Sequence, residues 1–589
     1  MAEIAIKVRH AGKAYDVEVN TASTGEELKM QLYSLTNVEP ENQKVLAKGK
    51  MVKDDTPLAS LSLKPGQIIT LMGTAAAHVV TEVPREKTKF TEDMTEAELA
   101  QQHGATPAGL QNTGNTCYAN ATLQTLRSIP ELQQELMSYK PSAPQAGPSA
   151  SNIFSPDQLA QYGLGGLGAG ADLTSALRDL YQQMGDTQQG FPPIMFLTAL
   201  RQKFPQFAEK AKNGHGYAQQ DAEEVWTQMI QTLHTSLQLQ DGAQGGGFKT
   251  FIDKYMGGRF EVTTTCDEAP EEESQVNSEE FHDLKCNIAG DTNHMSEGLR
   301  IALNEKLEKT SPSLNRTAIY TRKSLISRLP KHLPIHLIRF FWRKDTQKKA
   351  KILRKVTFQH EIDVTEFCTE ALRKKLVPVR DRVREVRKEE EDVERAKKRQ
   401  KRMRKEAAEG EATGGKVRSD EPLQKLKEKA EREAKAKGTG GEAGAGDGGA
   451  ASGPAVPEEE EKFKTDAEIE SERAASILAA KRALLAAVHP DLKADATANQ
   501  TGLCELRAVV THQGSSADSG HYTAYVKKTA PVGGVEDGKW WWFNDEKVVE
   551  VEGERIEGLA GGGESHSALI LLYRAVELPV VDGDQEMEG

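Results

Sequence analysis

The sequence predicts an α+β protein made of a small N-terminal unit and a much larger second unit. Residues 1–75 contain two runs of alternating apolar residues, a helical pattern and two more short strands, the order expected of a mixed sheet packed on one helix. Residues 76–105 are polar and poor in aromatic residues, which indicates a linker. Residues 106–576 mix strand and helix patterns over a length that can bury a large core.

The small unit is assigned from its apolar periodicity. Two strands flank a turn at Gly12, and a helix closed by Pro40 follows them, with Thr24 and Glu27 as a predicted capping box. Further strands fit Lys44–Ala47 and Gln67–Met72. The alternating and helical apolar positions are Ile4, Ile6, Val8, Tyr15, Val17, Val19, Leu28, Leu32 and Leu35.

Composition excludes several classes of protein. A net charge of -12 argues against a nucleic-acid partner, which would need surplus Lys and Arg, and no run approaches the ~20 apolar residues that span a membrane. Five cysteines without a CxxC pair argue against a disulfide framework and a zinc ribbon. We therefore expect a metal-free protein of the cytoplasm and nucleus.

The small unit resembles ubiquitin in the runs PENQKVLAKGK at 40–50, LASL at 58–61 and KPGQIITL at 64–71. The resemblance implies a β-grasp fold. The run after Leu71 lacks a terminal Gly-Gly pair and continues into more protein, so we expect a docking element that is not conjugated. Leu46, Gly49 and Met72 fall where ubiquitin has its apolar binding patch; incompletely buried core is the alternative.

Two segments of the large unit have unusual compositions. Residues 379–457 combine dense mixed charge with Gly- and Ala-rich sequence, which predicts an insertion of isolated charged helix and disorder. The basic run at 397–405 is interleaved with acids, which favours a solvated helix face over a nuclear-localisation or nucleic-acid patch. Residues 577–589 are predicted to form an acidic tail.

The run GLQNTGNTCYANATLQTL at 109–126 carries the strongest chemical signal. A tight turn at Gly114 is followed by a predicted helix that opens at Cys117, with Thr116 as its N-cap. A helix N-terminus favours thiolate over thiol, so Cys117 is a candidate nucleophile. The side chain of Asn112 and the backbone N–H of Cys117 are candidate donors to an oxyanion. The alternatives are an inert buried cysteine and an asparagine that only caps a turn.

A candidate base lies far downstream. The run SGHYTAYV at 519–526 predicts a strand with His521 at its start, and a histidine there can approach a thiol on a facing helix. WWWFNDEKV at 540–548 predicts the next strand, where either Asn544 or Asp545 could accept the imidazole N–H.

Together these blocks resemble the ubiquitin-specific protease family. Further similar runs are GYAQQDAEEVW at 216–226, LPKHLPIHLIRF at 329–340 and SALILLY at 567–573. The resemblance implies a papain-like fold with thumb, palm and fingers, and it makes Cys117 the nucleophile, His521 the general base and acid, Asn544 the third member and Asn112 the oxyanion donor. Asp545 stays an alternative to Asn544.

The resemblance also suggests substrate-binding residues. These are Gln220 and Asp221, for which helix packing is the alternative, and Gly520 and Tyr522 beside the candidate base. Many relatives close the fingers with four zinc-binding cysteines, which this chain lacks, so no metal and no other cofactor is implied.

The ubiquitin-like unit and the run GGGESH at 561–566 are similar to the proteasome-associated branch of the family. This narrower match implies docking on the proteasome regulatory particle through residues 1–75, with loops near Trp342–Lys351 and Thr511–Ser519 obstructing the groove until docking. The expected activity is thiol-dependent hydrolysis of isopeptide bonds at ubiquitin's C-terminal glycine, with ubiquitin and ubiquitinated proteins as partners. A non-catalytic proteasome adaptor and a hydrolase of another ubiquitin-like modifier are the alternatives.

Overall fold

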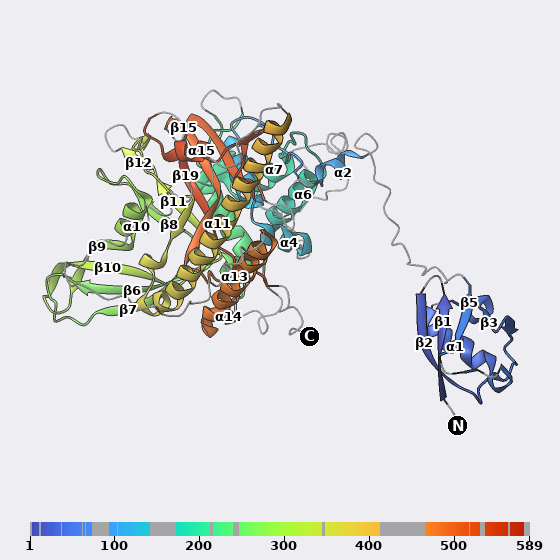
Figure 1. Ribbon diagram of the computed structural model, residues 1–589. Coiled ribbons are helices and arrows are strands. Elements are labelled where there is room, and N and C mark those ends of the chain that lie inside the picture. The colour runs from blue at the N-terminus through green and yellow to red at the C-terminus, as the bar shows by residue number, and fades with distance from the viewer. Residues whose placement is uncertain are drawn as a thin grey trace, which may run out of the picture. The chain divides into compact units, whose positions relative to one another are not determined.

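The computed structural model divides the chain into two compact units, Met1–Met94 and Thr95–Gly589. It describes residues 3–10, 13–36, 38–61, 63–64, 66–73, 94–102, 104–141, 172–211, 216–239, 247–343, 348–412, 466–516, 519–529, 536–563 and 566–581. Each unit is α+β, as the sequence predicts (Figure 1).

The small unit is a five-stranded mixed sheet packed on one helix. Its strands are β1 (Glu3–His10), β2 (Lys13–Asn20), β3 (Lys44–Ala47), β4 (Lys50–Val52) and β5 (Ile68–Met72), in the order β2-β1-β5-β3-β4. Strands β1 and β5 are parallel and the other neighbours antiparallel, which is the β-grasp arrangement. The helix α1 (Gly25–Thr36) buries Leu28 and Leu32 against the sheet.

The predicted apolar face of α1 is wrong at its last position. Leu35 is exposed, and Thr36 is buried in its place. The Thr36 hydroxyl is satisfied by donating to the backbone carbonyl of Leu32 at 2.6 Å, which allows a polar residue to end the buried face.

The large unit is built around a sheet whose main path runs β18-β17-β16-β15-β19-β11-β8, with β14 (Glu361–Asp363) paired to β15. All pairs are antiparallel except β11 with β8. The strands on the path are β8 (Leu284–Asn287), β11 (His332–Ile338), β15 (Leu503–Ser516), β16 (Ser519–Lys527), β17 (Trp540–Asn544), β18 (Lys547–Val551) and β19 (Ser567–Ala575).

Helices cover both faces of this sheet. One hydrophobic core joins it to α3 (Cys117–Arg127), α4 (Pro130–Ser138), α6 (Leu173–Gly185), α7 (Ile194–Lys203), α8 (Ala222–Ser236) and α9 (Phe251–Tyr255). A second core joins it to α10 (Met295–Leu303), α11 (Glu370–Ala412) and α13 (Asp466–Ala487). Strands β15, β16 and β19 contribute to both cores and therefore hold the unit together.

A second sheet extends away from the first at one side of the unit (Figure 1). It has the order β7-β6-β10-β9, with β6 (Gly258–Cys266), β7 (Gln275–Phe281), β9 (Asn304–Ser311) and β10 (Arg316–Arg328). Most of β7 and β9 is exposed, so this sheet depends on its root, where Phe281 and Ile326 enter the second core.

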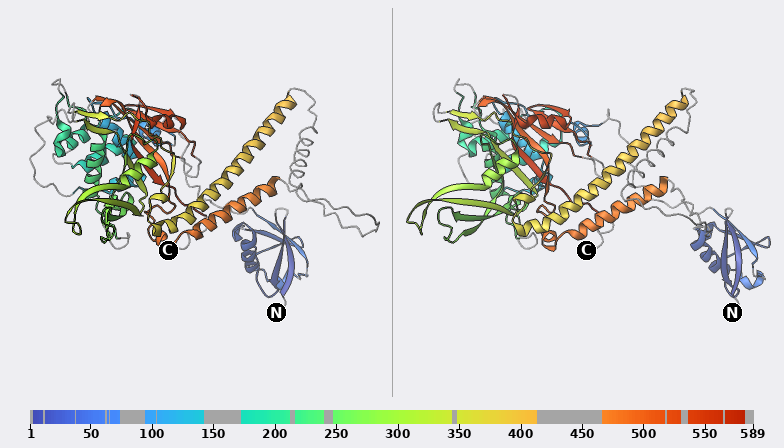
Figure 2. Two further views of the ribbon diagram at one scale, coloured as in Figure 1. Left: turned by 90° about the vertical axis from the view of Figure 1, so that its left-hand side faces the viewer. Right: turned by 60° about the vertical axis from the view of Figure 1, so that its left-hand side comes forward.

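The beginning of the charged insertion is part of the fold, which corrects the prediction of an isolated helix. Helix α11 starts before residue 379 and buries Val379, Val383 and Val386 beside Leu484 of α13 (Figure 2). Lys481 of α13 also pairs with Glu390 of α11 at 2.8 Å. The valines recur at spacings of four and three within dense charge, so an apolar stripe is present that overall composition conceals. Residues 413–457 of the predicted insertion lie outside the described residues.

Two predicted boundaries are also corrected. Residues 96–100 of the predicted linker form α2 (Glu96–Ala100), capped by Thr95 and Glu98, and the Thr187 hydroxyl donates to Glu96 at 2.6 Å. At the other end, Val581 of the predicted tail is buried. These two short segments are ordered because they contact the rest of the large unit, as Glu96 contacts Thr187. No helix among the described residues has the length and apolar character needed to cross a membrane.

Candidate active site

Cys117 is the first residue of α3, as the sequence predicts. The next nine residues of α3 are also buried, and the helix packs against β16 and β15. Thr116 occupies the N-cap position, as predicted, but its hydroxyl makes no capping bond to the helix and accepts instead from the Thr113 backbone N–H at 3.1 Å. The helix N-terminus is thus held by the loop before it.

Burial has the largest effect on the thiol, and it raises the pKa of Cys117 to about 11. The backbone N–H groups of Tyr522, Tyr118 and Cys117 lower this pKa, and the negative charge of Asp545 raises it. The predicted stabilisation by the helix N-terminus is therefore present but is outweighed. At neutral pH the resting nucleophile is a protonated thiol.

The candidate base lies on the strand that faces this thiol. His521 is in β16, one residue before Tyr522, whose backbone N–H contacts the Cys117 sulfur. The Nε2 of His521 is 2.6 Å from Oδ1 of Asn544 at the end of β17. With Nε2–H donating to this oxygen, Nδ1 is the nitrogen left to take a proton. The geometry thus favours Asn544 over Asp545 as the group that orients His521.

Asp545 connects the two distant parts of the site. Its carboxylate accepts from the side-chain amide of Asn112 at 3.0 Å and from that of Asn120 at 2.8 Å. The side-chain Oδ1 of Asn112 accepts from the backbone N–H groups of Gly114 and Thr116 at 3.0 and 3.2 Å. Because an amide nitrogen carries two protons, Asn112 keeps one N–H beyond its bond to Asp545.

Sequence reasoning missed Asn120. It is buried in α3, and its amide also donates to the backbone carbonyl of Leu110 at 3.2 Å. The available signal was a side-chain amide three residues after the cysteine, in the same helix.

The turn between β17 and β18 sits tightly against the segment before Cys117. The Leu110 backbone N–H donates to the Asp545 carbonyl at 3.0 Å. A Cβ added at Gly109 would lie 2.4 Å from the Glu546 carbonyl oxygen, so only glycine allows this approach. Asp545 itself has a φ of 51°, in the left-handed region that asparagine and aspartate tolerate.

The four predicted substrate-binding residues differ in their burial and in their contacts. Asp221 is buried and caps α8 by accepting from the Glu223 backbone N–H at 3.0 Å, while Gln220 before it is half-buried. Gly520 has a φ of 123°, and a Cβ there would lie 2.1 Å from the Gln513 carbonyl oxygen. The side chain of Tyr522 is fully buried, so its backbone is the part of that residue near the thiol.

A two-stranded hairpin, β12 (Phe340–Arg343) and β13 (Lys348–Lys351), is tied to β15 of the main sheet. The Lys351 ammonium donates to the His512 carbonyl of β15 at 2.7 Å, and burial lowers the pKa of Lys351 to about 8. Phe341 and Trp342 on the same hairpin are exposed. The hairpin is therefore fixed to β15 through Lys351 and exposes the apolar side chains of Phe341 and Trp342.

On the small unit, the predicted docking residues lie on the open face of the sheet. Leu46 of β3 is half-buried, Met72 of β5 is exposed, and Gly49 has a φ of 78° in the turn between β3 and β4. Met51 of β4 and Ile68 of β5 are also exposed, in alternation with buried Val52 and Ile69, and they extend this apolar patch beyond the predicted residues.

Two family models and several relatives match this chain. Residues 108–573 match the family model described as ubiquitin carboxyl-terminal hydrolase, and residues 4–76 match the ubiquitin family model. Ubiquitin carboxyl-terminal hydrolase 6 of Schizosaccharomyces pombe is 36% identical over 98% of this chain and 99% of its own length. Ubiquitin carboxyl-terminal hydrolase 7 of Arabidopsis thaliana is 34% identical over 97% of this chain and 99% of its own length. Ubiquitin carboxyl-terminal hydrolase 14 of Caenorhabditis elegans is 28% identical over 97% of this chain and 93% of its own length.

Among solved structures, the SAGA Ubp8/Sgf11/Sus1/Sgf73 DUB module bound to ubiquitin aldehyde aligns with a TM-score of 0.42 and 16% identity, covering 80% of this chain and 70% of that chain. The matches to the family models and to the full-length relatives show what the chain is. It belongs to the ubiquitin carboxyl-terminal hydrolase family, as a cysteine-type deubiquitinase that carries an N-terminal ubiquitin-like domain.

Proposed function

We propose that this enzyme hydrolyses the isopeptide bond at the C-terminal glycine of ubiquitin on substrates bound to the proteasome, with Cys117 as nucleophile. The Cys117 sulfur attacks the glycine carbonyl carbon while its proton passes to His521. The C–N bond then breaks, His521 returns the proton to the departing lysine amine, and a thioester remains. Water hydrolyses the thioester with His521 again as base, which releases the ubiquitin carboxylate and restores the thiol.

The observation that supports these roles is the 2.6 Å contact between His521 and Asn544. Tyr522, which follows His521 on β16, contacts the Cys117 thiol through its backbone N–H. It gives His521 one nitrogen that is fixed and one that can exchange a proton. The pKa of about 11 at Cys117 adds that the resting thiol is protonated, so proton transfer accompanies the attack. Charge then develops on sulfur only when substrate is present.

Asn112 is the proposed donor to the oxyanion. One of its amide protons is held by Asp545 at 3.0 Å, which orients the second without an energetic cost during the reaction. The backbone N–H of Cys117 is the other proposed donor. The second N–H of Asn112 is the group whose loss should slow the chemical step.

The test of catalysis uses the full chain. Cys117→Ala should abolish release of a fluorophore from the C-terminus of a ubiquitin amide while ubiquitin binding is retained. A non-catalytic adaptor would show no turnover in the parent protein either. Parallel electrophilic probes built on ubiquitin and on other ubiquitin-like modifiers would show which modifier the site accepts.

We propose that the apolar patch of the small unit, which consists of Leu46, Gly49, Met51, Ile68 and Met72, docks this enzyme on the proteasome regulatory particle. A β-grasp domain with an open apolar sheet face and no conjugation terminus supports a docking role. We further propose that the hairpin β12–β13 obstructs the ubiquitin tail until docking, and that the enzyme acts in the cytoplasm and nucleus. Residues 511–516, predicted as part of a second obstructing loop, instead end β15, where Thr511 and His512 are buried.

The docking proposal has a matched control within the same unit. Met72 and Met30 are almost equally exposed, at 54% and 55%, but Met30 lies on α1 and Met72 on the open face of the sheet. Met72→Lys should remove co-sedimentation with proteasomes, whereas Met30→Lys should leave it intact. Equal co-sedimentation of both variants would refute docking through this patch, while hydrolysis by the free enzyme should be unaffected in either.

A further inference from the structure

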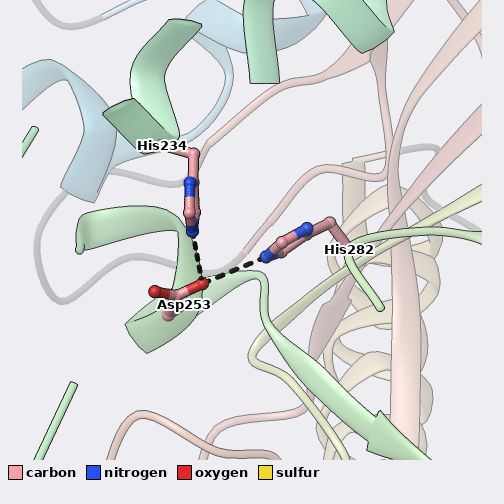
Figure 3. Close-up of side chains that lie close together, drawn as sticks. All are labelled: His234, Asp253 and His282. Atoms are coloured by element: carbon pink, nitrogen blue, oxygen red, sulfur yellow. Dashed lines mark hydrogen bonds and ion pairs between the residues drawn. The ribbon is translucent and has the colours of Figure 1, made fainter. Parts of the chain in front are cut away.

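Two histidines and one aspartate converge at the root of the second sheet of the large unit (Figure 3). His234 lies near the end of α8, Asp253 lies in α9, and His282 directly follows β7. The Nε2 atoms of both histidines approach the same oxygen, Oδ1 of Asp253, at 3.0 and 3.1 Å. We propose that these three side chains bind one divalent transition-metal ion of the zinc type.

The donor atoms suit such an ion in kind and in spacing. Imidazole nitrogen and carboxylate oxygen are standard zinc ligands, and bonds of about 2.0–2.1 Å in a tetrahedron place ligand atoms about 3.3 Å apart. The two N···O separations need only a few tenths of an ångström to reach this value. All three donor atoms lie within 4.8 Å of one another, and the two imidazole rings are 5.3 Å apart and tilted by 58°.

The cluster is also reachable from solution. The side chains of His234, Asp253 and His282 are 40%, 23% and 31% exposed. Three protein ligands leave a fourth tetrahedral position, which water can take without entering the core. An ion can thus enter without unfolding the domain.

Backbone contacts hold the ligands in place before any ion arrives. The Phe251 N–H donates to the Leu237 carbonyl and the Leu239 N–H to the Lys249 carbonyl, both at 3.0 Å, which fixes the start of α9 against the end of α8. The guanidinium of Arg328 contacts the backbone carbonyls of Lys254 and Gly257 at the other end of α9.

The third ligand is anchored by the residue before it. Phe281 is buried and packs so closely on Gly258 that a Cβ there would lie 2.1 Å from its ring. Because His282 follows Phe281, its position is set by this contact. Preorganisation of this kind lowers the entropy cost of binding an ion.

The ordinary alternative is an ion-pair cluster, in which each imidazole donates its Nε2–H to the Asp253 carboxylate. Metal binding requires both Nε2 atoms to lose that proton, so the two arrangements exclude one another and can be told apart. The metal-free fold was predicted from the absence of paired cysteines, and this cluster contains no cysteine.

An ion here would join three separate segments of the chain. It would link the end of α8 to the segments on both sides of the hairpin β6–β7, because Asp253 precedes β6 and His282 follows β7. The expected role is to stiffen the attachment of the second sheet. This role is separate from the chemistry at Cys117.

The test is titration of the full-length Cys117→Ala protein with Zn²⁺ in competition with a chromophoric chelator, a background in which the catalytic thiol cannot act as ligand. We expect about one equivalent to bind, and Co²⁺ in its place should give visible tetrahedral bands without a thiolate charge-transfer band. Binding should be lost in the added double variant His234→Gln/His282→Gln. His489→Gln is the matched control, because His489 also faces an aspartate, at 3.6 Å from Asp491.

Thermal unfolding provides a second readout. Saturating Zn²⁺ should raise the unfolding temperature of Cys117→Ala and of its His489→Gln derivative by about 2 °C or more, and that of the double histidine variant not at all. The single variant His282→Gln should show the same loss if the double variant does not fold. Equal zinc binding by the parent and the histidine variants, no binding by the parent, or a thiolate band with Co²⁺ would overturn the proposal.

Discussion

The imidazole of His521 is held by the side-chain amide of Asn544, with 2.6 Å between Nε2 and Oδ1. The two residues lie on adjacent antiparallel strands, β16 and β17, so the sheet sets their separation. Asp545, the next residue, makes its side-chain bonds to Asn112 and Asn120. Two neighbouring residues thus serve two parts of the site, Asn544 the base and Asp545 the segment that carries Cys117.

Asn544→Ala should lower kcat for ubiquitin-amide hydrolysis by about tenfold to a hundredfold, because His521 loses the group that fixes its orientation. KM should change little. Asn544→Asp keeps an oxygen acceptor and should retain most of the activity. The acidic limb of the pH–rate profile of this variant should move to higher pH, since a carboxylate stabilises the imidazolium. If the alanine variant kept full kcat, the proposed role of Asn544 would be wrong.

Asp545→Asn should increase alkylation of Cys117 by iodoacetamide at pH 8.5 by about twofold to tenfold, because it removes a negative charge that raises the pKa of the thiol. In the parent protein the rate should still climb between pH 9 and the thiol pKa of about 11, since the thiolate fraction grows over that range. Rates are assigned to Cys117 by mass spectrometry. Asp16→Asn, on the small unit, controls for net charge, and a slower reaction of the Asp545 variant would contradict the prediction.

Gly109→Ala should reduce hydrolysis strongly while the domain still folds. The new Cβ would lie 2.4 Å from the Glu546 carbonyl oxygen and would force the β17–β18 turn away from Leu110. Overpacking of this kind costs about 1–3 kcal/mol, which a domain of this size can absorb. Gly290→Ala is the matched control because nothing lies within 4 Å of its added Cβ. Equal activities in the two variants would show that this close approach does not position the site.

Lys351→Met should raise hydrolysis by the free enzyme. The substitution removes the bond from the ammonium to the His512 carbonyl, so the hairpin β12–β13 should separate from β15 more easily. Activity with purified proteasome should change less, because docking is proposed to displace the same hairpin. Hydrogen exchange over residues 340–352 measures the loosening directly. Faster exchange without any gain in activity would separate this hairpin from control of the groove.

Local patterns predicted most of the framework of the fold. Alternating apolar residues identified the strands of the small unit, and helix signals located the start of α3 at Cys117. Both patterns arise from side-chain spacing within one element, which the sequence contains in full. The valines of α11 carry a signal of the same kind, but dense surrounding charge obscured it.

Properties that arise from tertiary packing could not be predicted. The sign of the pKa shift at Cys117 depends on burial by the facing sheet, which exceeds the effect of the helix N-terminus. The contact of Asn120 with Asp545 spans 425 positions of the sequence. The cluster of His234, Asp253 and His282 has no motif, because its members come from three separate elements.

The most direct test of the account is to identify the residue that ubiquitin carrying a C-terminal vinyl sulfone modifies in the full-length enzyme. Cys117 should be the modified residue, and His521→Ala should slow the adduct strongly, since the buried thiol depends on that base for its deprotonation. The other four cysteines, Cys266, Cys286, Cys368 and Cys504, should stay unmodified. An adduct on any of them, or labelling of Cys117 at an unchanged rate without His521, would contradict the proposed site.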